Sequence, residues 1–487
     1  MFFNSIDFAL FLPLVFLLYW FVANKNLTLN NLLIVAASYL FYGWWDWRFL
    51  SLILFSTIID YSICRTLASE EGLAKRKILL WTSIIVNLSF LGFFKYYNFF
   101  VDNFVDAFSF FGTEIKANTL TIILPVGISF YTFQTLSYTI DVYRRKLAPT
   151  KDFIAFSAFV SFFPQLVAGP IERATNLLPQ FYKKRTFNYS QAVDGMRQIV
   201  WGLFKKIVIA DNCAEYANVI FDNSGHYSGS TLAMGAVFFA FQIYGDFSGY
   251  SDIAIGTSRL FGFNLKRNFA FPYFSRDIGE FWRRWHISLS TWFRDYLYIP
   301  LGGSHGSTWK KIRNTFILFI VSGFWHGSNW TFIAWGTLNA IYFLPLLLTN
   351  RNRKNLETVA PGKHLPTLKD AINILITFSL TTLAWIFFRA DSIDHAFNYI
   401  SRMVSGLFHS SAYSETLHMI NEQVGYLIPI LVLLFIIIEW RGRANQYAIA
   451  DLGLKWKRPI RYAMYYSLII VIFWFGGKEQ EFIYFQF

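Results

Sequence analysis

Residues 314–349 read NTFILFIVSGFWHGSNWTFIAWGTLNAIYFLPLLLT, an apolar stretch with no Asp, Glu, Lys or Arg. A helix needs about 20 predominantly apolar residues to cross the hydrocarbon core of a bilayer. This stretch is therefore long enough for two crossings, at 314–331 and 333–349. It predicts a membrane protein, and it places an ionisable side chain, His326, inside the first of the two crossings.

The composition of the whole chain supports this class. The 487 residues are 55% hydrophobic and 15% charged, whereas soluble domains average about 25% charged residues. The apolar segments recur along the full length, which predicts one polytopic membrane domain over residues 1–487 rather than several soluble domains. The net charge of +13 lies in short basic links between these segments. That placement indicates membrane topology and contact with anionic lipid, and we expect no nucleic-acid partner.

The expected fold is all-α, with about 11–13 membrane helices together with re-entrant or interfacial helices. The apolar stretch 152–170 is interrupted by Pro164, Gly169 and Pro170, so it is expected to be re-entrant or interfacial. Assigning the basic links to the cytoplasm gives a consistent alternation with both termini outside. The predicted spans are 7–23, 30–46, 48–65, 78–99, 119–140, 194–210, 231–247, 314–331, 333–349, 371–388, 424–440 and 461–475.

His326 lies 12 residues after the start of its predicted span, roughly 18 Å into the membrane. An ionisable side chain at that depth is costly and indicates function, although a neutral imidazole bonded to a neighbouring helix is an equally simple interpretation. Gly323 and Gly327 would allow another helix or a substrate chain to approach the backbone closely. Trp325 would supply a flat wall beside that space.

A second histidine, His286, lies in FWRRWHISLSTWFRDYLYIPLGG (281–303), where aromatic and basic residues alternate. The pattern predicts an amphipathic helix over 276–298 at the cytoplasmic interface. One interpretation is an interfacial aromatic-basic belt without chemistry. The other is a mouth that binds an anionic acyl donor, since arginine is a natural phosphate ligand. The residues nearest to the histidine in this pattern are Arg283, Arg284, Trp285 and Arg294.

Asp246 lies in YGDFSGYSD (244–252), which we expect at the cytoplasmic end of a span. It would orient a histidine, bind a hydroxyl group, or cap the helix. The chain has no HExxH, GxSxG, P-loop or Rossmann glycine pattern, which argues against zinc hydrolysis, serine hydrolysis and the usual nucleotide chemistry. We expect no metal site, and Cys64 and Cys213 form no ligand or disulfide pattern.

Several strings in this sequence resemble the membrane-bound O-acyltransferase (MBOAT) family. The resemblance is greatest to the bacterial branch that includes the alginate O-acetyltransferase membrane subunit, and it covers nearly the whole chain. The strings are LPVGISFYTFQTLSYTIDVYR (124–144), SFFPQLVAGPIER (161–173), GLFKKIVIAD (202–211), YGDFSGYSDIAIG (244–256), the string around His286, SGFWHG (322–327) and the tail EFIYFQF (481–487).

The resemblance implies a helical funnel with a central tunnel, in which His326 is the catalytic histidine and His286 the second characteristic one. It implies transfer of an acetyl group from a cytoplasmic thioester to an exported or cell-wall polysaccharide. The donor would be acetyl-CoA or, as in the similar D-alanyl transfer protein, a carrier-bound acyl group. No tightly bound cofactor is implied.

The implied setting is the bacterial plasma (inner) membrane, with membrane lipid and a periplasmic acetyltransferase as partners. Two other classes stay open from the residues alone. A transporter or flippase would use His326 as a proton relay. A scaffold of a glycan-export complex would need neither histidine.

Overall fold

The computed structural model describes residues 1–112, 119–476, 480 and 482–483, and every regular element in these residues is a helix. The prediction of an all-α protein is therefore confirmed. The chain divides into two compact units, one formed by residues 1–195 and 254–266, the other by 196–253 and 267–487. That these units act as one domain stays a prediction.

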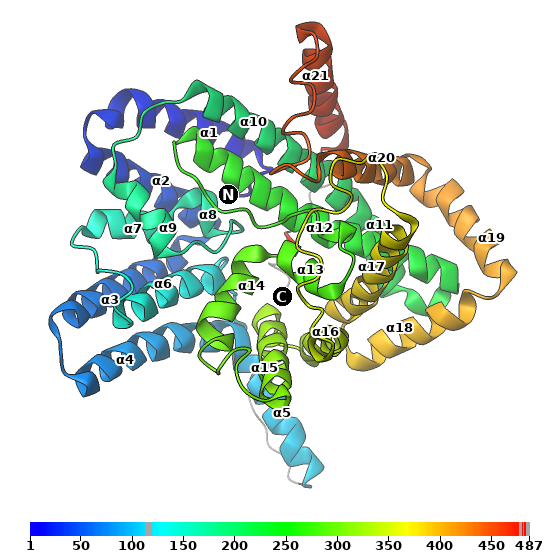
Figure 1. The fold of residues 1–487 in the computed structure, drawn as a ribbon, viewed down its shortest axis with the longest axis horizontal. Coiled ribbons are helices and arrows are strands. Elements are labelled where there is room, and N and C mark those ends of the chain that lie inside the picture. The colour runs from blue at the N-terminus through cyan, green and yellow to red at the C-terminus, as the bar shows by residue number, and fades with distance from the viewer. Residues whose placement is uncertain (113–118, 477–479, 481, 484–487) are drawn as a thin grey trace. The chain divides into compact units, whose positions relative to one another are not determined.

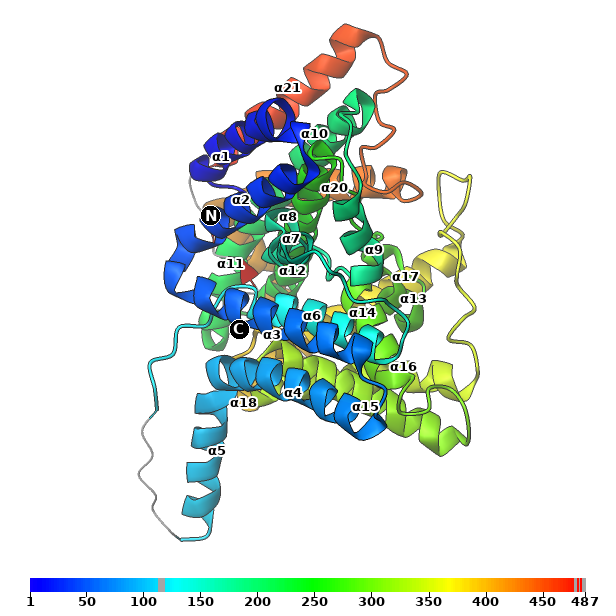
Figure 2. The same cartoon turned by 90° about the vertical axis from the view of Figure 1, so that its left-hand side faces the viewer.

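The first unit contains nine complete α-helices among its described residues, together with short 3-10 and π-helical segments. A buried hydrogen-bond network joins three of these helices. The Asp60 carboxylate of α3 accepts hydrogen bonds from Ser83 and Asn87 of α4 and from Thr139 of α6. Figure 2 shows α3, α4 and α6 lying side by side. The helices are α1 (Ile6–Leu17), α2 (Leu27–Asp46), α3 (Leu50–Ser69), α4 (Leu73–Leu91), α5 (Tyr97–Phe110), α6 (Ile128–Tyr143), α7 (Phe153–Ser161), α8 (Phe163–Leu166) and α9 (Ala174–Leu177).

The segment 152–170 is broken, as its prolines and glycine predict. It forms α7 and the short α8, which are separated at Phe162. Phe159, Phe162 and Leu166 are fully buried. An irregular backbone at this depth is tolerated only when protein surrounds it, and these residues meet that condition.

The second unit supplies the helices that matter for the site. Two helices belong to both units along the chain: α10 (Tyr189–Leu203) enters the second unit and α12 (Gly229–Leu260) leaves it. The others are α11 (Asp211–Asp222), α13 (Ile278–Arg284), α14 (Ile287–Phe293), α15 (Thr308–His326), α16 (Trp330–Leu348), α17 (Leu368–Arg389), α18 (Ile393–Gly406), α19 (Ser410–Met419), α20 (Leu427–Gly442) and α21 (Arg458–Phe475).

Five helical segments in the described part of the chain are long and apolar enough to cross a membrane, and six if the bent pair Ser410–Val424 and Leu427–Gly442 forms one span. The five are Ile6–Lys25, Leu27–Ser69, Leu73–Phe110, Trp330–Leu348 and Leu368–Arg389. The chain is thus a multi-pass membrane protein. The remaining predicted spans overlap helices that do not meet this requirement, and residues 119–127 of the span predicted over 119–140 are not helical.

Helices α15 and α16 pack closely, side by side (Figure 1). A Cβ atom on Gly323 would collide with the carbonyl oxygen of Phe332, and one on Gly336 would collide with the carbonyl oxygen of Phe319. Small residues let membrane helices approach to backbone contact. The two glycines therefore fix the spacing of this hairpin, at whose turn His326 lies.

A buried ionic cluster ties the C-terminal segment to α12. The Lys206 ammonium lies 2.8 Å from Asp211 and 2.8 Å from Asp246. It also donates to the carbonyl oxygen of Gln480, while the Ile483 N–H donates to Asp246 at 2.7 Å. A cation shared by two carboxylates satisfies the requirement that buried charges be paired. Asp246 is thus in the interior of α12, and the expectation that it ends or caps a helix was wrong.

Gly323→Ala is expected to destabilise the protein by about 1–3 kcal/mol, because the added methyl group must push the two helices apart. Thermal unfolding of the purified protein in detergent measures this loss. Gly225→Ala is the matched control, since no atom lies within 4 Å of its added Cβ. Equal unfolding temperatures for the two variants would show that the close packing does not stabilise the hairpin.

Lys206→Met is expected to cost about 3–5 kcal/mol, because it leaves two buried carboxylates without their cation. The same unfolding measurement tests it, with Lys455→Met as the control at an exposed position. The loss should also release the C-terminal segment, which limited proteolysis after residue 476 would detect. A variant as stable as the control would contradict this role of the cluster.

Candidate active site

The predicted amphipathic helix over 276–298 is wrong, because the chain breaks in the middle of that segment. α13 ends at Arg284 and α14 begins at Ile287. His286, between them, has φ 42° and ψ 56°, in the left-handed region. This conformation is uncommon for a residue with a side chain, and it turns the chain sharply so that His286 is 1% exposed and faces the interior.

An extended segment beside the break satisfies the backbone groups that the missing helical turn leaves. The Ala270 N–H donates to the carbonyl oxygen of Arg284, and the Ile287 N–H donates to that of Asn268, both at 2.9 Å. The Ser288 hydroxyl donates to the Asn268 side-chain oxygen at 2.9 Å. Buried backbone groups need such partners, so the segment from Asn268 to Ala270 makes the break possible.

His326 also lies at a helix end, which corrects its expected place inside a span over 314–331. α15 ends at His326, and Gly327 continues in an extended conformation. The Asn329 side chain then accepts from the Thr331 N–H and caps the start of α16. The side chain of His326 is nevertheless buried, with 3% of the residue exposed.

The two histidines, 40 positions apart in sequence, meet in the folded second unit. Their ring centroids are 6.5 Å apart. Trp325 touches both rings, with centroid distances of 6.0 Å to His286 and 4.9 Å to His326. Further aromatic rings surround the pair. Phe247 lies 4.6 Å from His286, and Trp335 and Phe388 lie 5.1 and 5.3 Å from His326, between ring centroids.

This aromatic setting determines the charge state of His286. Burial lowers the pKa of the His286 imidazole from its ordinary value to about 3, because desolvation penalises the charged form. The ring is neutral at neutral pH. A neutral imidazole has one donor and one acceptor nitrogen, so it is able to accept a proton or to donate a hydrogen bond to a developing oxyanion.

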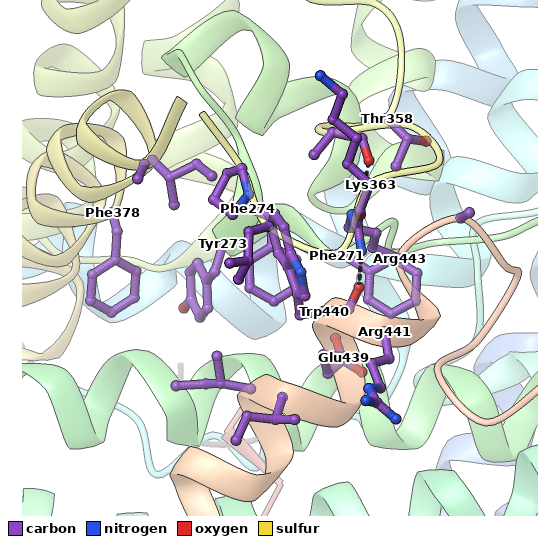
Figure 3. A pocket seen from close by; sticks show the side chains of 18 of the residues that line it. Phe271, Tyr273, Phe274, Thr358, Lys363, Phe378, Glu439, Trp440, Arg441 and Arg443 are labelled. Atoms are coloured by element: carbon purple, nitrogen blue, oxygen red, sulfur yellow. Dashed lines mark hydrogen bonds between the residues drawn. The ribbon is translucent and has the colours of Figure 1, made fainter. Parts of the chain in front are cut away.

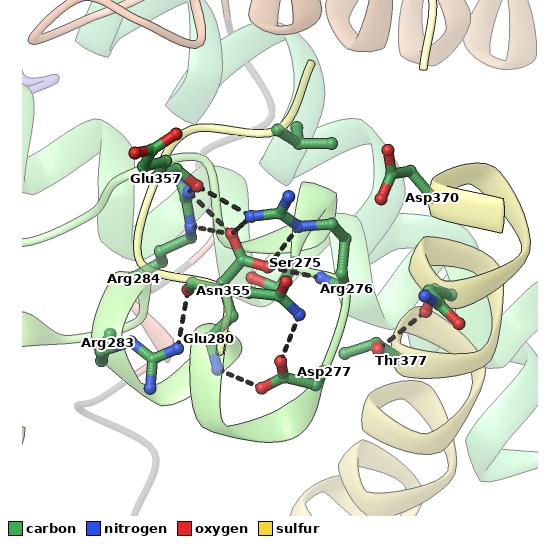
Figure 4. Close-up of polar contacts among 12 residues, drawn as sticks. Ser275, Arg276, Asp277, Glu280, Arg283, Arg284, Asn355, Glu357, Asp370 and Thr377 are labelled. Carbon is green, nitrogen blue, oxygen red and sulfur yellow. Dashed lines mark hydrogen bonds and ion pairs between the residues drawn. The ribbon is translucent and has the colours of Figure 1, made fainter. Parts of the chain in front are cut away.

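The arginines near His286 are engaged in the protein fold (Figure 4). Arg284 pairs with the buried Glu280 at 2.8 Å and also donates to backbone carbonyls. Arg283 donates to the carbonyl oxygens of Asn352 and Asn355, at 2.6 and 2.9 Å. These two arginines fasten the segment 352–357. Their predicted role in binding an acyl donor stays a prediction, and it would require them to exchange these partners.

Arg294 differs from the other two arginines because its side chain is 57% exposed. Among the described residues, its one ion pair is with the neighbouring Asp295, at 2.6 Å. Of the predicted donor-binding arginines, it is the one that a ligand could reach without disturbing the core. Trp285, by contrast, is 1% exposed. Its ring packs on those of Phe281 and Trp385, with centroid distances of 5.6 and 5.0 Å. These contacts indicate that Trp285 stabilises the chain break between α13 and α14 rather than contacting a ligand.

Sequence reasoning did not identify Phe247 or the C-terminal segment as parts of the site. Phe482 packs on Phe247 at 6.0 Å and on Tyr250 at 4.5 Å, and Phe247 in turn packs on His286. The described residues of the tail therefore contact the histidine pair indirectly, through Phe247. The resemblance of the tail string was the available signal, although residues 481 and 484–487 lie outside the described residues.

Comparison with known proteins identifies the family of this chain. Residues 144–388 match the model of the membrane-bound O-acyltransferase family, a range that includes both histidines. The chain is 38% identical to a Pseudomonas aeruginosa protein named as a probable alginate O-acetylase, AlgI, over 91% of this chain and 82% of that protein.

Two other relatives differ in the polymer that they are named for. The chain is 35% identical to a peptidoglycan O-acetyltransferase of Helicobacter pylori, over 98% of this chain and 95% of that protein. It is 31% identical to a teichoic acid D-alanyltransferase of Streptococcus thermophilus, over 57% of this chain and 69% of that protein. The chain belongs to the membrane-bound O-acyltransferase family and is an acyltransferase.

Proposed function

We propose that this protein moves an acetyl group from a cytoplasmic thioester, acetyl-CoA, to a hydroxyl group of an exported or cell-wall polysaccharide. The observation that carries the proposal is the pair of buried imidazoles, 6.5 Å apart between ring centroids, in a chain of this family. Two relatives that match over 99% and 98% of this chain are named for O-acetylation of alginate and of peptidoglycan, which supports acetyl as the group and a polysaccharide as the acceptor.

In the proposed step, a nitrogen of His326 accepts the proton of the acceptor hydroxyl. The hydroxyl oxygen attacks the thioester carbonyl carbon, the carbon–sulfur bond breaks, and the thiolate takes the proton from the imidazolium. The products are the O-acetyl ester and the free thiol. A well-placed general base contributes about 10²–10⁴-fold to the rate. His286 and the Trp325 indole N–H are suited to donate to the developing oxyanion.

The proposed setting follows from this chemistry. The thioester forms in the cytoplasm and the polymer lies outside, so the chain would act across the bacterial plasma membrane. A periplasmic acetyltransferase would be its protein partner if a relay, rather than direct transfer, carries the group to the polymer, and no tightly bound cofactor takes part. Arg294 is the exposed cation that we assign to the donor phosphates, since guanidinium binds phosphate well.

A carrier-bound acyl group is the second candidate donor, because the resemblance to the D-alanyl transfer protein implies such a donor. The two donors are distinguished by supplying labelled acetyl-CoA to inside-out membrane vesicles from cells that express the chain. Release of free CoA with incorporation of label supports acetyl-CoA. Incorporation only after addition of an acylated carrier protein supports the alternative.

His326→Ala is expected to reduce incorporation of labelled acetyl groups into envelope polysaccharide by about 10²-fold or more, because the general base is lost. The measurement compares initial rates in membranes that contain equal amounts of the two proteins. His305→Ala, in an exposed loop of the same unit, is the control and should keep the wild-type rate.

Near-normal transfer by His326→Ala would contradict the catalytic role and favour a non-catalytic scaffold. Loss of transport of intact glycan with unchanged acetylation would favour the transporter. Membrane levels and unfolding temperature are measured beside the rate, so that a misfolded variant is not mistaken for an inactive one.

A further inference from the structure

The second unit contains a large cavity that is separate from the histidine pair. Its volume is about 1670 Å³, above the range of about 300–1,000 Å³ that is usual for small-molecule sites. It lies among α12, α17 and α20 and is closed at one end by the segment 356–366. A cavity of this size suits a long molecule better than a compact metabolite.

The body of the cavity is apolar. Phe241 of α12, Phe378 of α17 and Phe435 of α20 line it, together with aliphatic side chains of α17 and α20. Tyr273 and Phe274 continue the aromatic lining, and Figure 3 shows them following Phe378 across the cavity. This lining matches a hydrocarbon chain, because burying apolar surface is favourable and places no requirement for hydrogen bonds on the ligand.

Basic side chains gather at the end of the cavity that the segment 356–366 lines (Figure 3). Arg443 stabilises the backbone at this end. Its guanidinium donates to the carbonyl oxygens of Val359, Ala360 and Lys363 at 2.9, 2.7 and 2.6 Å. These bonds hold the segment 356–366 over the end of α20. Lys363 and Arg441 are exposed, so their charges are available at a rim whose backbone is fixed.

The acidic side chains at the cavity do not neutralise the positive charge of this rim. Glu439 is 3% exposed and accepts a hydrogen bond from Tyr244 at 2.5 Å, which directs its oxygen toward a partner in the protein. Glu357 is exposed at the rim. The cavity thus has three basic side chains, Lys363, Arg441 and Arg443, against two carboxylates, one of them buried.

The candidate span α17 and the helix α20, one half of the bent pair, lie beside the cavity and indicate its orientation in a bilayer. The candidate span α17 begins at Leu368, next to the basic rim, and α20 ends at Gly442 at the same rim. Leu375 and Ile437, which line the cavity farther along these helices, are 65% and 45% exposed. Large apolar side chains exposed on spanning helices face lipid. The apolar body therefore opens toward the hydrocarbon region and the basic rim lies at the interface.

We propose that this cavity binds an anionic glycerophospholipid. Its phosphate would lie at Lys363 and Arg441, and one acyl chain would lie along Phe241, Phe378 and Phe435. Basic pockets between membrane helices on the cytoplasmic side bind anionic headgroups, and each Lys or Arg near an anionic lipid contributes about 1 kcal/mol. The site does not depend on the proposed acyl transfer, and either conclusion stands if the other fails.

Native mass spectrometry of the delipidated full-length protein tests the proposal. Phosphatidylglycerol and phosphatidylcholine with identical acyl chains are the probes. The wild-type protein should bind phosphatidylglycerol about tenfold more tightly or more. Lys363→Glu/Arg441→Glu should remove that preference. Lys455→Glu/Lys457→Glu, an equal charge change at exposed positions of the link after α20, should keep it.

A second pair of variants tests the apolar body. Ile374→Trp fills the cavity from α17 and should weaken phosphatidylglycerol binding, whereas Leu433→Trp, on the exposed face of α20 outside the lining, should leave binding unchanged. If the Glu variant does not fold, Lys363→Gln/Arg441→Gln replaces it, and the unfolding temperature without lipid verifies folding.

Three results would overturn the proposal. The first is unchanged preference in the Lys363 and Arg441 variant. The second is equal binding of glycerol 3-phosphate, which would identify an anion site without a lipid chain. The third is competitive displacement of the lipid by acetyl-CoA, which would make the cavity part of the donor site.

Discussion

Every buried backbone N–H and C=O group in an apolar interior needs a partner within the protein, and the position of His286 depends on this constraint. A continuous helix over 276–298 would satisfy its own backbone, but it would place the histidine on a helix surface. The chain breaks instead, and Asn268 and Ala270 bond the groups that the break leaves. His286 is thereby directed into the interior, where Trp325 and His326 meet it.

The site also requires the close packing of α15 against α16. Backbone contact at Gly323 and Gly336 brings the turn with His326 against Trp335 and the neighbouring aromatic rings. The charged side chains described above lie around the histidine pair and are paired with other groups of the protein. Lys206 binds Asp246 beside the tail, and Arg283 and Arg284 hold the segment 352–357. The result is an aromatic environment around two buried imidazoles, in which burial favours the neutral form of His286.

Apolar periodicity and motif resemblance were sufficient to predict the all-helical class and the broken segment 152–170. They also singled out the two histidines that meet in the fold, whose catalytic role stays a prediction. They did not predict where the helices end. A left-handed residue at His286 has no hydropathy signal, and His326 ends α15 because of Gly327 and the cap at Asn329 rather than because of a change in polarity. The partner of Asp246 was also hidden, since Lys206 lies 40 positions away and pairs with it only after η6 (Phe204–Ala210) packs on α12.

The central claim is that His286 and His326 act as one site, and a double-mutant cycle on the rate of acetyl transfer tests it most directly. The rates of His286→Ala, His326→Ala and the double variant are compared with the wild type at equal protein levels. Groups that act as a unit are strongly non-additive, so the account predicts that the double variant is no slower than His326→Ala alone. Independent losses that multiply in the double variant would contradict it.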